Sequence, residues 1–174
     1  EWSAAGDSIG LSPTSGTVDP DVDITFTADI GDSPDEVSVL FTVTPTFTYD
    51  GVSCVGTTDQ QQTFTVIVNP EPQIDDFAET ICEGDTFASI TPVNDTNGVV
   101  PSGTTYTWVI ADNSSPNVLG GSASTAPSAT IPGSELTLVD GTTSPQDLIY
   151  TVTPITEEGC VGDPFTVTIT VNPT

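Results

Sequence analysis

The sequence predicts an all-β protein composed of tandem antiparallel β-sandwiches, and three observations support this prediction. Hydrophobic residues make up 35% of the 174 residues and charged residues only 14%, so the chain can bury a core although its net charge is −25. Val and Thr, which fit a pleated sheet, are abundant. Fifteen Gly and fifteen Pro interrupt the chain at short intervals, as expected for short strands joined by turns.

The expected strands follow a period of two, in which apolar side chains alternate with Thr. Val39, Phe41 and Val43, for example, fall on one face of such a strand, and Thr42 falls on the other. In chain order, the expected strands are 24–26, 39–43, 64–68, 106–110, 136–138, 148–152 and 167–171. Trp108 is expected to fill the core between two sheets, as a central Trp does in an Ig-like sandwich. No segment has a 3.6-residue period long enough to predict a helix.

The sequence contains an internal repeat of roughly one sandwich domain in length. Three motifs recur at spacings of 109, 106 and 103 residues: VLFTVTP at 39–45 and LIYTVTP at 148–154, CVG at 54–56 and 160–162, and TFTVIVNP at 63–70 and TVTITVNP at 166–173. Trp2 matches Trp108, because each precedes its TVTP motif by a little over 40 residues. The chain is therefore expected to contain two copies of one domain.

We expect a complete repeat at 71–174 and a repeat truncated at its N-terminus at 1–70. The first copy has no counterpart of residues 71–107. The alternative is a first copy that is a shorter natural variant. Asn69-Pro70-Glu71-Pro72 joins the two copies, and its two prolines predict a short, semi-rigid linker.

The charge pattern excludes several classes of function. The chain has 25 Asp and Glu residues and no Lys, Arg or His. Nucleic acid and anionic membrane surfaces are excluded as partners, because both are bound through cationic side chains. Catalytic triads and His-ligated metals are excluded because they need His. Membrane insertion is not expected, since the apolar runs are far shorter than the ~20 residues of a spanning helix. We expect no enzyme and assign no catalytic residue.

Two of the three cysteines occupy equivalent positions of the repeat. Cys54 and Cys160 each begin a CVG motif, whereas Cys82 falls in the segment that the first copy lacks. We therefore expect a Cys82–Cys160 disulfide within the second copy, with Cys54 unpaired. The alternatives are three free thiols or a Cys54–Cys82 bridge between the copies. A disulfide would place the protein outside the cytoplasm.

Clustered acidic residues raise the question of a metal ion, because Ca²⁺ prefers carboxylate oxygens. Asp19, Asp21 and Asp23 alternate before an expected strand, and Asp75 and Asp76 follow the linker. A calcium site at these five residues is one hypothesis. The alternative is that they are solvated loop acids, which contribute hydration and solubility. No other cofactor is expected.

Four motifs resemble the PKD-like repeats of giant Bacteroidota cell-surface adhesins, a group that includes the SprB-like gliding-motility adhesins. They are ICEGDTF at 81–87, TTYTW at 104–108, IYTVTP at 149–154 and GCVGDPFTVTITVNP at 159–173. The resemblance implies an Ig/PKD-like sandwich, repeated along a cell-surface filament that is exported by type IX secretion. The absence of Lys departs from the pattern of these repeats. Asp7-Ser8-Ile9 resembles the O-glycosylation motif of Bacteroidota, so Ser8 is either glycosylated or unmodified.

We therefore expect an extracellular, semi-rigid acidic spacer in a large surface adhesin or filament. Its expected partners are neighbouring repeats of the same polypeptide, surface polysaccharide or other copies of the filament. One alternative is a carbohydrate-binding accessory module of a secreted protein, which would expose coplanar aromatic side chains on one sheet face. The other is a self-assembling fibre subunit completed by strand addition from a neighbouring chain.

Overall fold

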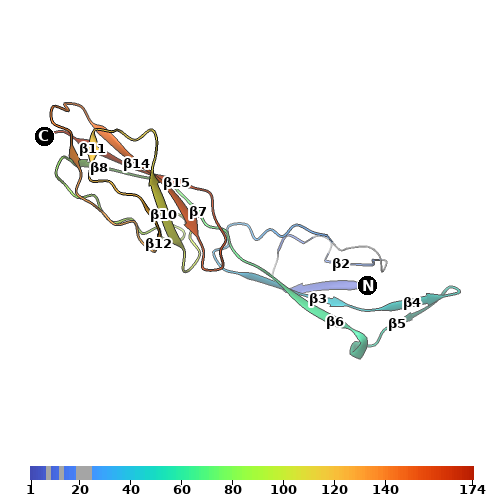
Figure 1. Ribbon diagram of the computed structural model, residues 1–174. Coiled ribbons are helices and arrows are strands. Elements are labelled where there is room, and N and C mark those ends of the chain that lie inside the picture. The colour runs from blue at the N-terminus through green and yellow to red at the C-terminus, as the bar shows by residue number, and fades with distance from the viewer. Residues whose placement is uncertain (7–8, 12–13, 19–24) are drawn as a thin grey trace. The chain divides into compact units, whose positions relative to one another are not determined.

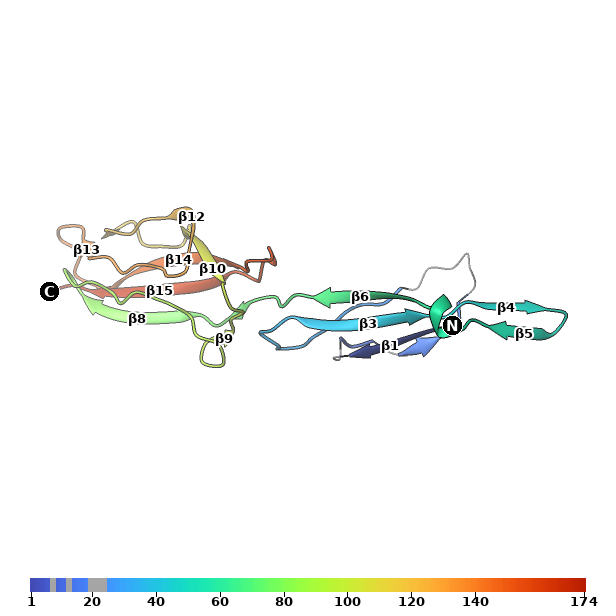
Figure 2. The ribbon, with the colours of Figure 1, turned by 90° about the horizontal axis from the view of Figure 1, so that it is seen from below.

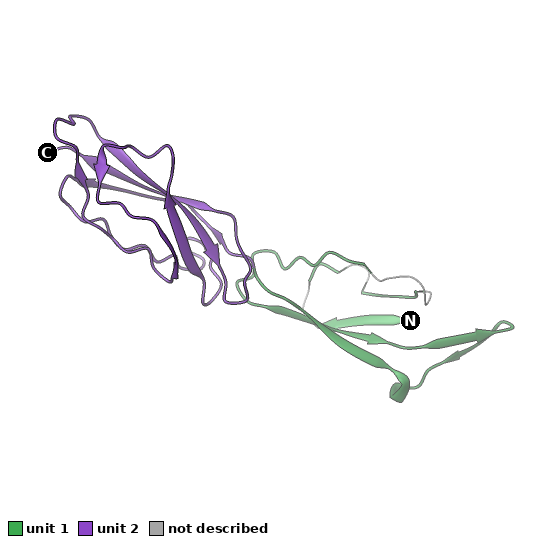
Figure 3. Ribbon diagram, in the orientation of Figure 1, with its two compact units in different colours: residues 1–70 green, residues 71–174 purple. Residues whose placement is uncertain are grey.

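The computed structural model describes residues 1–6, 9–11, 14–18 and 25–174 (Figure 1). The chain divides into two compact units, Glu1–Pro70 and Glu71–Thr174, coloured separately in Figure 3. In the described residues both units are built of β-strands, and a short 3₁₀ turn, η1 at Thr58–Gln60, is the one helical element. The predicted all-β fold class is therefore confirmed. Within these ranges, no helix has the length and apolar character needed to cross a lipid bilayer.

Unit 2, residues 71–174, contains a five-stranded sheet. Its strand order is β12 (Ser124–Ser128), β10 (Thr105–Ile110), β14 (Gln146–Ile155), β15 (Phe165–Asn172) and β8 (Phe77–Cys82). The first four strands pair antiparallel, as predicted, whereas β8 runs parallel to β15 (Figure 2). The predicted antiparallel sandwich therefore carries one parallel strand pair at this edge. The long crossover between β8 and β15, which holds β10 and β14, makes a parallel pairing possible.

A second layer covers one face of this sheet. It contains the short strand pair β11 (Val118–Leu119) with β13 (Thr137–Leu138), and a separate short pair joins β7 (Gln73–Ile74) with β9 (Gly98–Val99). The core between the layers includes Phe87, Ile131 and Leu136 from the covering segments and the inward side chains of the sheet. On β15 these inward residues are Phe165, Val167, Ile169 and Val171, and all four are buried while the intervening Thr residues are half-buried. The period of two in the sequence therefore separates core from surface.

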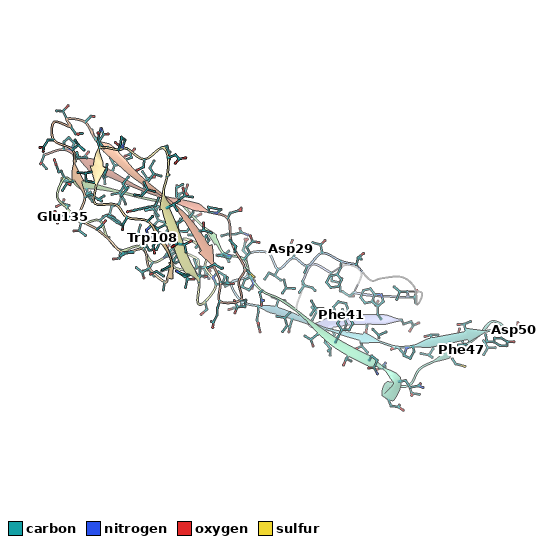
Figure 4. All side chains as sticks on the ribbon, in the orientation of Figure 1. Asp29, Phe41, Phe47, Asp50, Trp108 and Glu135 are labelled. Carbon is teal, nitrogen blue, oxygen red and sulfur yellow. The ribbon has the colours of Figure 1, made fainter. Side chains whose placement is uncertain are left out.

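Trp108 lies in this core, as predicted (Figure 4). Its ring is 6% exposed, and its indole N–H donates a hydrogen bond of 2.8 Å to the Ser122 carbonyl oxygen. Tyr150 is buried nearby and its hydroxyl accepts the N–H of Ser122. Both aromatic residues thus hold the segment that follows β11 against the sheet, and both satisfy their polar atoms as they do so.

Unit 1 contains a four-stranded sheet and a separate hairpin. The sheet order is β2 (Ser15–Gly16), β1 (Trp2–Gly6), β3 (Val37–Val43) and β6 (Gln62–Val68). The hairpin pairs β4 (Thr46–Tyr49) with β5 (Val52–Val55). The core is small and consists of Trp2, Ile9, Val39 and Phe41 with half-buried neighbours. The strand expected at 24–26 does not form at Thr25 and Phe26; Ile24 lies outside the described residues.

The sequence repeat is also a repeat of strand pairing. Trp2 pairs with Val43 in unit 1, and the corresponding Trp108 pairs with Val152 in unit 2. Strands β3 and β6 also pair in the same register as β14 and β15. The Phe41–Phe64 pair of unit 1 corresponds to the Tyr150–Val167 pair of unit 2, and Val39–Val66 corresponds to Leu148–Ile169. Strands β2-β1-β3-β6 therefore correspond to β12-β10-β14-β15, and unit 1 has no described counterpart of β8.

The buried tyrosines predict an alkaline limit to the stability of unit 2. Burial raises the pKa of Tyr106 to about 12 and also raises the pKa of Tyr150. Unfolded tyrosine ionises near pH 10, so the unfolded state loses its proton first and stability falls as the pH rises from about 10 to 12. For Tyr106 we expect a loss of about 2–3 kcal/mol across this window.

Urea unfolding between pH 8 and 12 measures this loss. The variant Tyr106→Phe should lose less stability over the same range and retain only the contribution of Tyr150. Identical alkaline profiles for the two proteins would contradict the assignment.

Candidate functional site

The most exposed apolar surface of the described chain is one face of the β4–β5 hairpin. Phe47 is 68% exposed and Tyr49 is 75% exposed. They lie on the same face because they are two residues apart on β4. Their cross-strand partners, Cys54 and Val52, add to that face, which we call the hairpin face. Figure 4 shows Phe47 on this hairpin, with Asp50 at its turn.

The opposite side of the hairpin is more polar. Its turn has a regular backbone conformation. The hydroxyl groups of Thr48 and Ser53 form a cross-strand hydrogen bond of 2.8 Å. Asp50 and Gly51 have φ angles of 47° and 77°. Two successive residues with positive φ form the type I′ turn that suits a tight hairpin, and Asp-Gly is a preferred sequence for it. The local sequence therefore specifies an amphipathic hairpin.

This hairpin is a longer form of the equivalent connection in unit 2, where the antiparallel bridge between Ile155 and Val161 corresponds to the Thr46–Val55 pair. In unit 1 the N–H of Gly56 donates to the Pro45 carbonyl, and the equivalent Gly162 donates to Pro154 in unit 2. Between these fixed points unit 1 has three more residues, as the spacings of the flanking motifs show. In unit 2 the shorter connection contains no exposed aromatic residue. The hairpin face is thus not needed to build the shared fold.

Sequence reasoning overlooked the hairpin face. Its signal was present, because Phe47 and Tyr49 alternate with Thr immediately before an Asp-Gly pair. The alternation alone does not distinguish a core strand from one that projects away from the core. Trp108, which the sequence placed in the core, is buried, and so is Tyr106 on the same strand.

The predicted acidic sites are not brought together in the described residues. Asp76 accepts the backbone N–H of Thr166 at 2.6 Å, so it connects the start of β8 with β15. Asp75 donates its own N–H to the Asn97 carbonyl. No group of three or more Asp, Glu or Cys side chains suited to a metal ion occurs in the part of the chain that the structure describes. The calcium hypothesis for Asp19, Asp21 and Asp23 and the glycosylation hypothesis for Ser8 concern residues outside it.

The predicted Cys82–Cys160 disulfide is wrong. All three cysteines are described, and all three are free. Cys82 lies opposite Asn172 at the end of β15, whereas Cys160 precedes Phe165 at its start. The length of β15 separates them by on the order of 20 Å, and a disulfide needs Cα atoms within about 7 Å. The repeat pattern showed that Cys82 and Cys160 belong to the same domain. It did not show at which end of the sheet each cysteine lies.

Because the negative charge of the chain is uncompensated, we expect added salt to stabilise the folded protein. With 25 acidic side chains and no cationic ones, the charges on the folded chain repel each other. Raising NaCl from 10 mM to 1 M shortens the Debye length to about 3 Å and screens this repulsion. We expect a gain of about 1 kcal/mol in each unit, which corresponds to a Tm increase of about 4–8 °C.

Thermal unfolding followed by circular dichroism checks this expectation. The same titration at pH 3, where most carboxylates are protonated, serves as the control and should show a smaller increase. An equal increase at both pH values would indicate a general salt effect on apolar burial instead of charge screening.

Comparison with known proteins gives a matching family and several similar solved structures. The PKD-like domain family matches residues 79–174. The crystal structure of chicken VE-cadherin EC1-2 is similar at 16% sequence identity and a TM-score of 0.36, over 99% of this chain and 83% of that chain. That likeness is too low to indicate a function. None of the curated proteins matches the chain.

Proposed function

Because this chain belongs to the PKD-like domain family, we propose that it is a semi-rigid acidic spacer in a large bacterial surface adhesin or filament. PKD-like domains are typically extracellular structural modules. Two copies of one strand arrangement occur in tandem here, as expected of a repeat array. A spacer of this kind must stay soluble and must resist tension along its length. The negative net charge supports solubility, and the strand order of unit 2 supports resistance to tension.

The pairing of the first long strand of unit 2 with its last strand carries the proposal. Phe77 at the start of β8 lies opposite Val167, and Cys82 at its end lies opposite Asn172. Because the two strands are parallel, the chain enters this pair at one end and leaves it at the other. Tension on the two ends of the unit therefore acts along the strands and loads their hydrogen bonds together, which opposes unfolding more strongly than peeling them apart one by one.

Its net charge of −25 supplies the solubility that an exposed filament needs. The motifs that resemble SprB-like gliding-motility adhesins support a Bacteroidota adhesin exported by type IX secretion. Its partners in this proposal are the neighbouring repeats of the same polypeptide. The chain also lacks every cationic side chain that catalysis commonly uses, in keeping with a structural and not an enzymatic role.

Surface labelling tests the location that this proposal requires. Antibodies raised against residues 71–174 should label intact cells of the producing organism, and brief treatment with a non-specific protease should remove the label. An antibody against a cytoplasmic protein serves as the control for cell integrity. Labelling that appears only after the cells are broken would overturn the proposal.

A second function, binding of polysaccharide, is favoured by the hairpin face. Phe47 and Tyr49 present two exposed aromatic rings on one side of β4, as the carbohydrate-binding alternative requires. Aromatic rings of this kind stack on the apolar faces of sugar rings. In a pull-down with insoluble polysaccharides, the wild-type chain should be retained and the double variant Phe47→Ala, Tyr49→Ala should not. The variant Val109→Ala, which alters an exposed apolar residue of unit 2, is the matched control.

A further inference from the structure

The outer edge of β6 in unit 1 is the feature that the proposed function leaves unused. β6 pairs with β3 along one edge, and no strand in the described part of the chain pairs with its other edge. In unit 2 the equivalent strand, β15, pairs with β14 on one edge and with β8 on the other. Unit 2 therefore shows which kind of strand occupies this edge when the sheet is complete.

The inward side chains of β6 are exposed where those of β15 are buried. Phe64 is 48% exposed, whereas its equivalent Val167 is fully buried. Phe64 nevertheless faces the core side of the sheet, because its ring stacks on that of Phe41 at a centroid distance of 4.9 Å. Val66 and Val68 are also less buried than their equivalents Ile169 and Val171. The apolar surface that β8 and its following segment cover in unit 2 is thus open in unit 1.

The backbone of β6 also presents its free donors to this edge. Thr44 donates its N–H to the Glu1 carbonyl on the β1 side of β3, so the N–H groups of Val43 and Phe41 point to β6. Phe64 pairs with Phe41 and bonds to β3, so the N–H groups of Thr65 and Ile67 point to the outer edge. In unit 2 the N–H of Thr166 points the same way and donates to Asp76, next to β8.

A second copy of this chain is not a satisfactory source of the missing strand. The sequence contains one β8 segment and two sheet edges that accept such a strand. If β8 moved from unit 2 of one copy to unit 1 of another, it would leave an equivalent edge open in the unit it left. Exchange between copies therefore gains no pairing, and the strand must come from a segment outside residues 1–174.

We propose that the outer edge of β6 binds an extended strand of the β8 type in parallel orientation, supplied by a PKD-like repeat segment that lies outside residues 1–174. The register in unit 2 places the residue equivalent to Phe77 opposite Phe64 and the residue equivalent to Ile81 opposite Val68. The ligand is a segment with apolar side chains at these two inward positions, four residues apart. Main-chain hydrogen bonds provide affinity and the alternate side chains provide specificity, as in other strand additions. This inference goes beyond the spacer role and holds whether or not that role is correct.

A synthetic peptide with the sequence of residues 75–88, carrying Cys82→Ser to prevent oxidation, tests the proposal on the full chain. We expect saturable binding with a stoichiometry of one. Amide hydrogen exchange should slow at Thr65 and Ile67 at least tenfold and should stay unchanged at Thr166 and Thr168. A peptide that also carries Phe77→Asp and Ile81→Asp is the control and should not bind.

Two variants of the chain locate the binding. Thr65→Pro removes an N–H that points to the outer edge and leaves the hydrogen bonds to β3 in place, so it should abolish binding. Phe64→Ser keeps every backbone donor and should weaken binding at least tenfold, which keeps the test valid if the proline variant unfolds unit 1. Binding that is unchanged in Phe64→Ser, protection that appears only in unit 2, or concentration-dependent self-association of the chain without peptide would each overturn the proposal.

Discussion

Replacing Trp108 by Ala is expected to lower the unfolding free energy of unit 2 by about 3–5 kcal/mol. The ring is 6% exposed in the main core, so its removal leaves a cavity lined by the two layers. It also removes the hydrogen bond of 2.8 Å that the indole N–H donates to the Ser122 carbonyl. Because Ser122 is exposed, water can replace the indole as the partner of its carbonyl oxygen, so the lost burial of the ring accounts for most of the cost. This loss is a large fraction of the stability of a small domain.

Urea unfolding of the full chain measures the effect, because Trp2 remains as a fluorescent reporter of unit 1. Its transition serves as the internal control and should not move. Trp108→Phe is the matched variant, since it fills most of the cavity and loses only the N–H, and its cost should be smaller. A loss below about 1 kcal/mol in Trp108→Ala would show that the ring is not the central element of this core.

The sequence predicted most of the sheet because each strand carries its own evidence. The alternation of apolar and Thr residues on β3, β6, β14 and β15 marks the inward face. The repeat went further, because two matching motifs that pair in one copy must pair in the same register in the other. The identical pairing of Trp2 with Val43 and of Trp108 with Val152 bears this out.

Sequence reasoning failed where the outcome depends on partners distant in the chain. Nothing in residues 77–82 states that their neighbour is β15 or that the two run parallel, because alternation sets a face and not a direction. The missing strand direction also led to the incorrect disulfide, because without it the sequence did not show that Cys82 and Cys160 lie at opposite ends of the sheet. At Phe26 the structure replaces an expected strand by a ring stacked on Phe41 at 5.4 Å. There a tertiary contact outweighs the local β propensity.

Removing one hydrogen bond between β8 and β15 is expected to lower the resistance of unit 2 to force. The N–H of Thr166 points to β8 and donates to Asp76, so the N–H of Thr168, two residues on, points there as well. Thr168→Pro deletes this donor without removing a core side chain, because Thr168 lies on the outer face of β15. We expect a cost on the order of 1–3 kcal/mol, and forced unfolding, which the unfolding rate governs, should become about tenfold faster or more.

Single-molecule pulling on the full chain through its two ends measures this, with unit 2 identified by the extension that its 104 residues release on unfolding. The control is Thr80→Pro on β8. Glu83 donates its N–H to the Asn172 carbonyl of β15, so alternate residues of β8 face β15 and the N–H of Thr80 faces away. Thr80→Pro should therefore unfold at nearly the wild-type force. If the two proline variants weaken unit 2 equally, the parallel pair does not bear the load, and the mechanical part of the proposed function fails while the fold assignment stands.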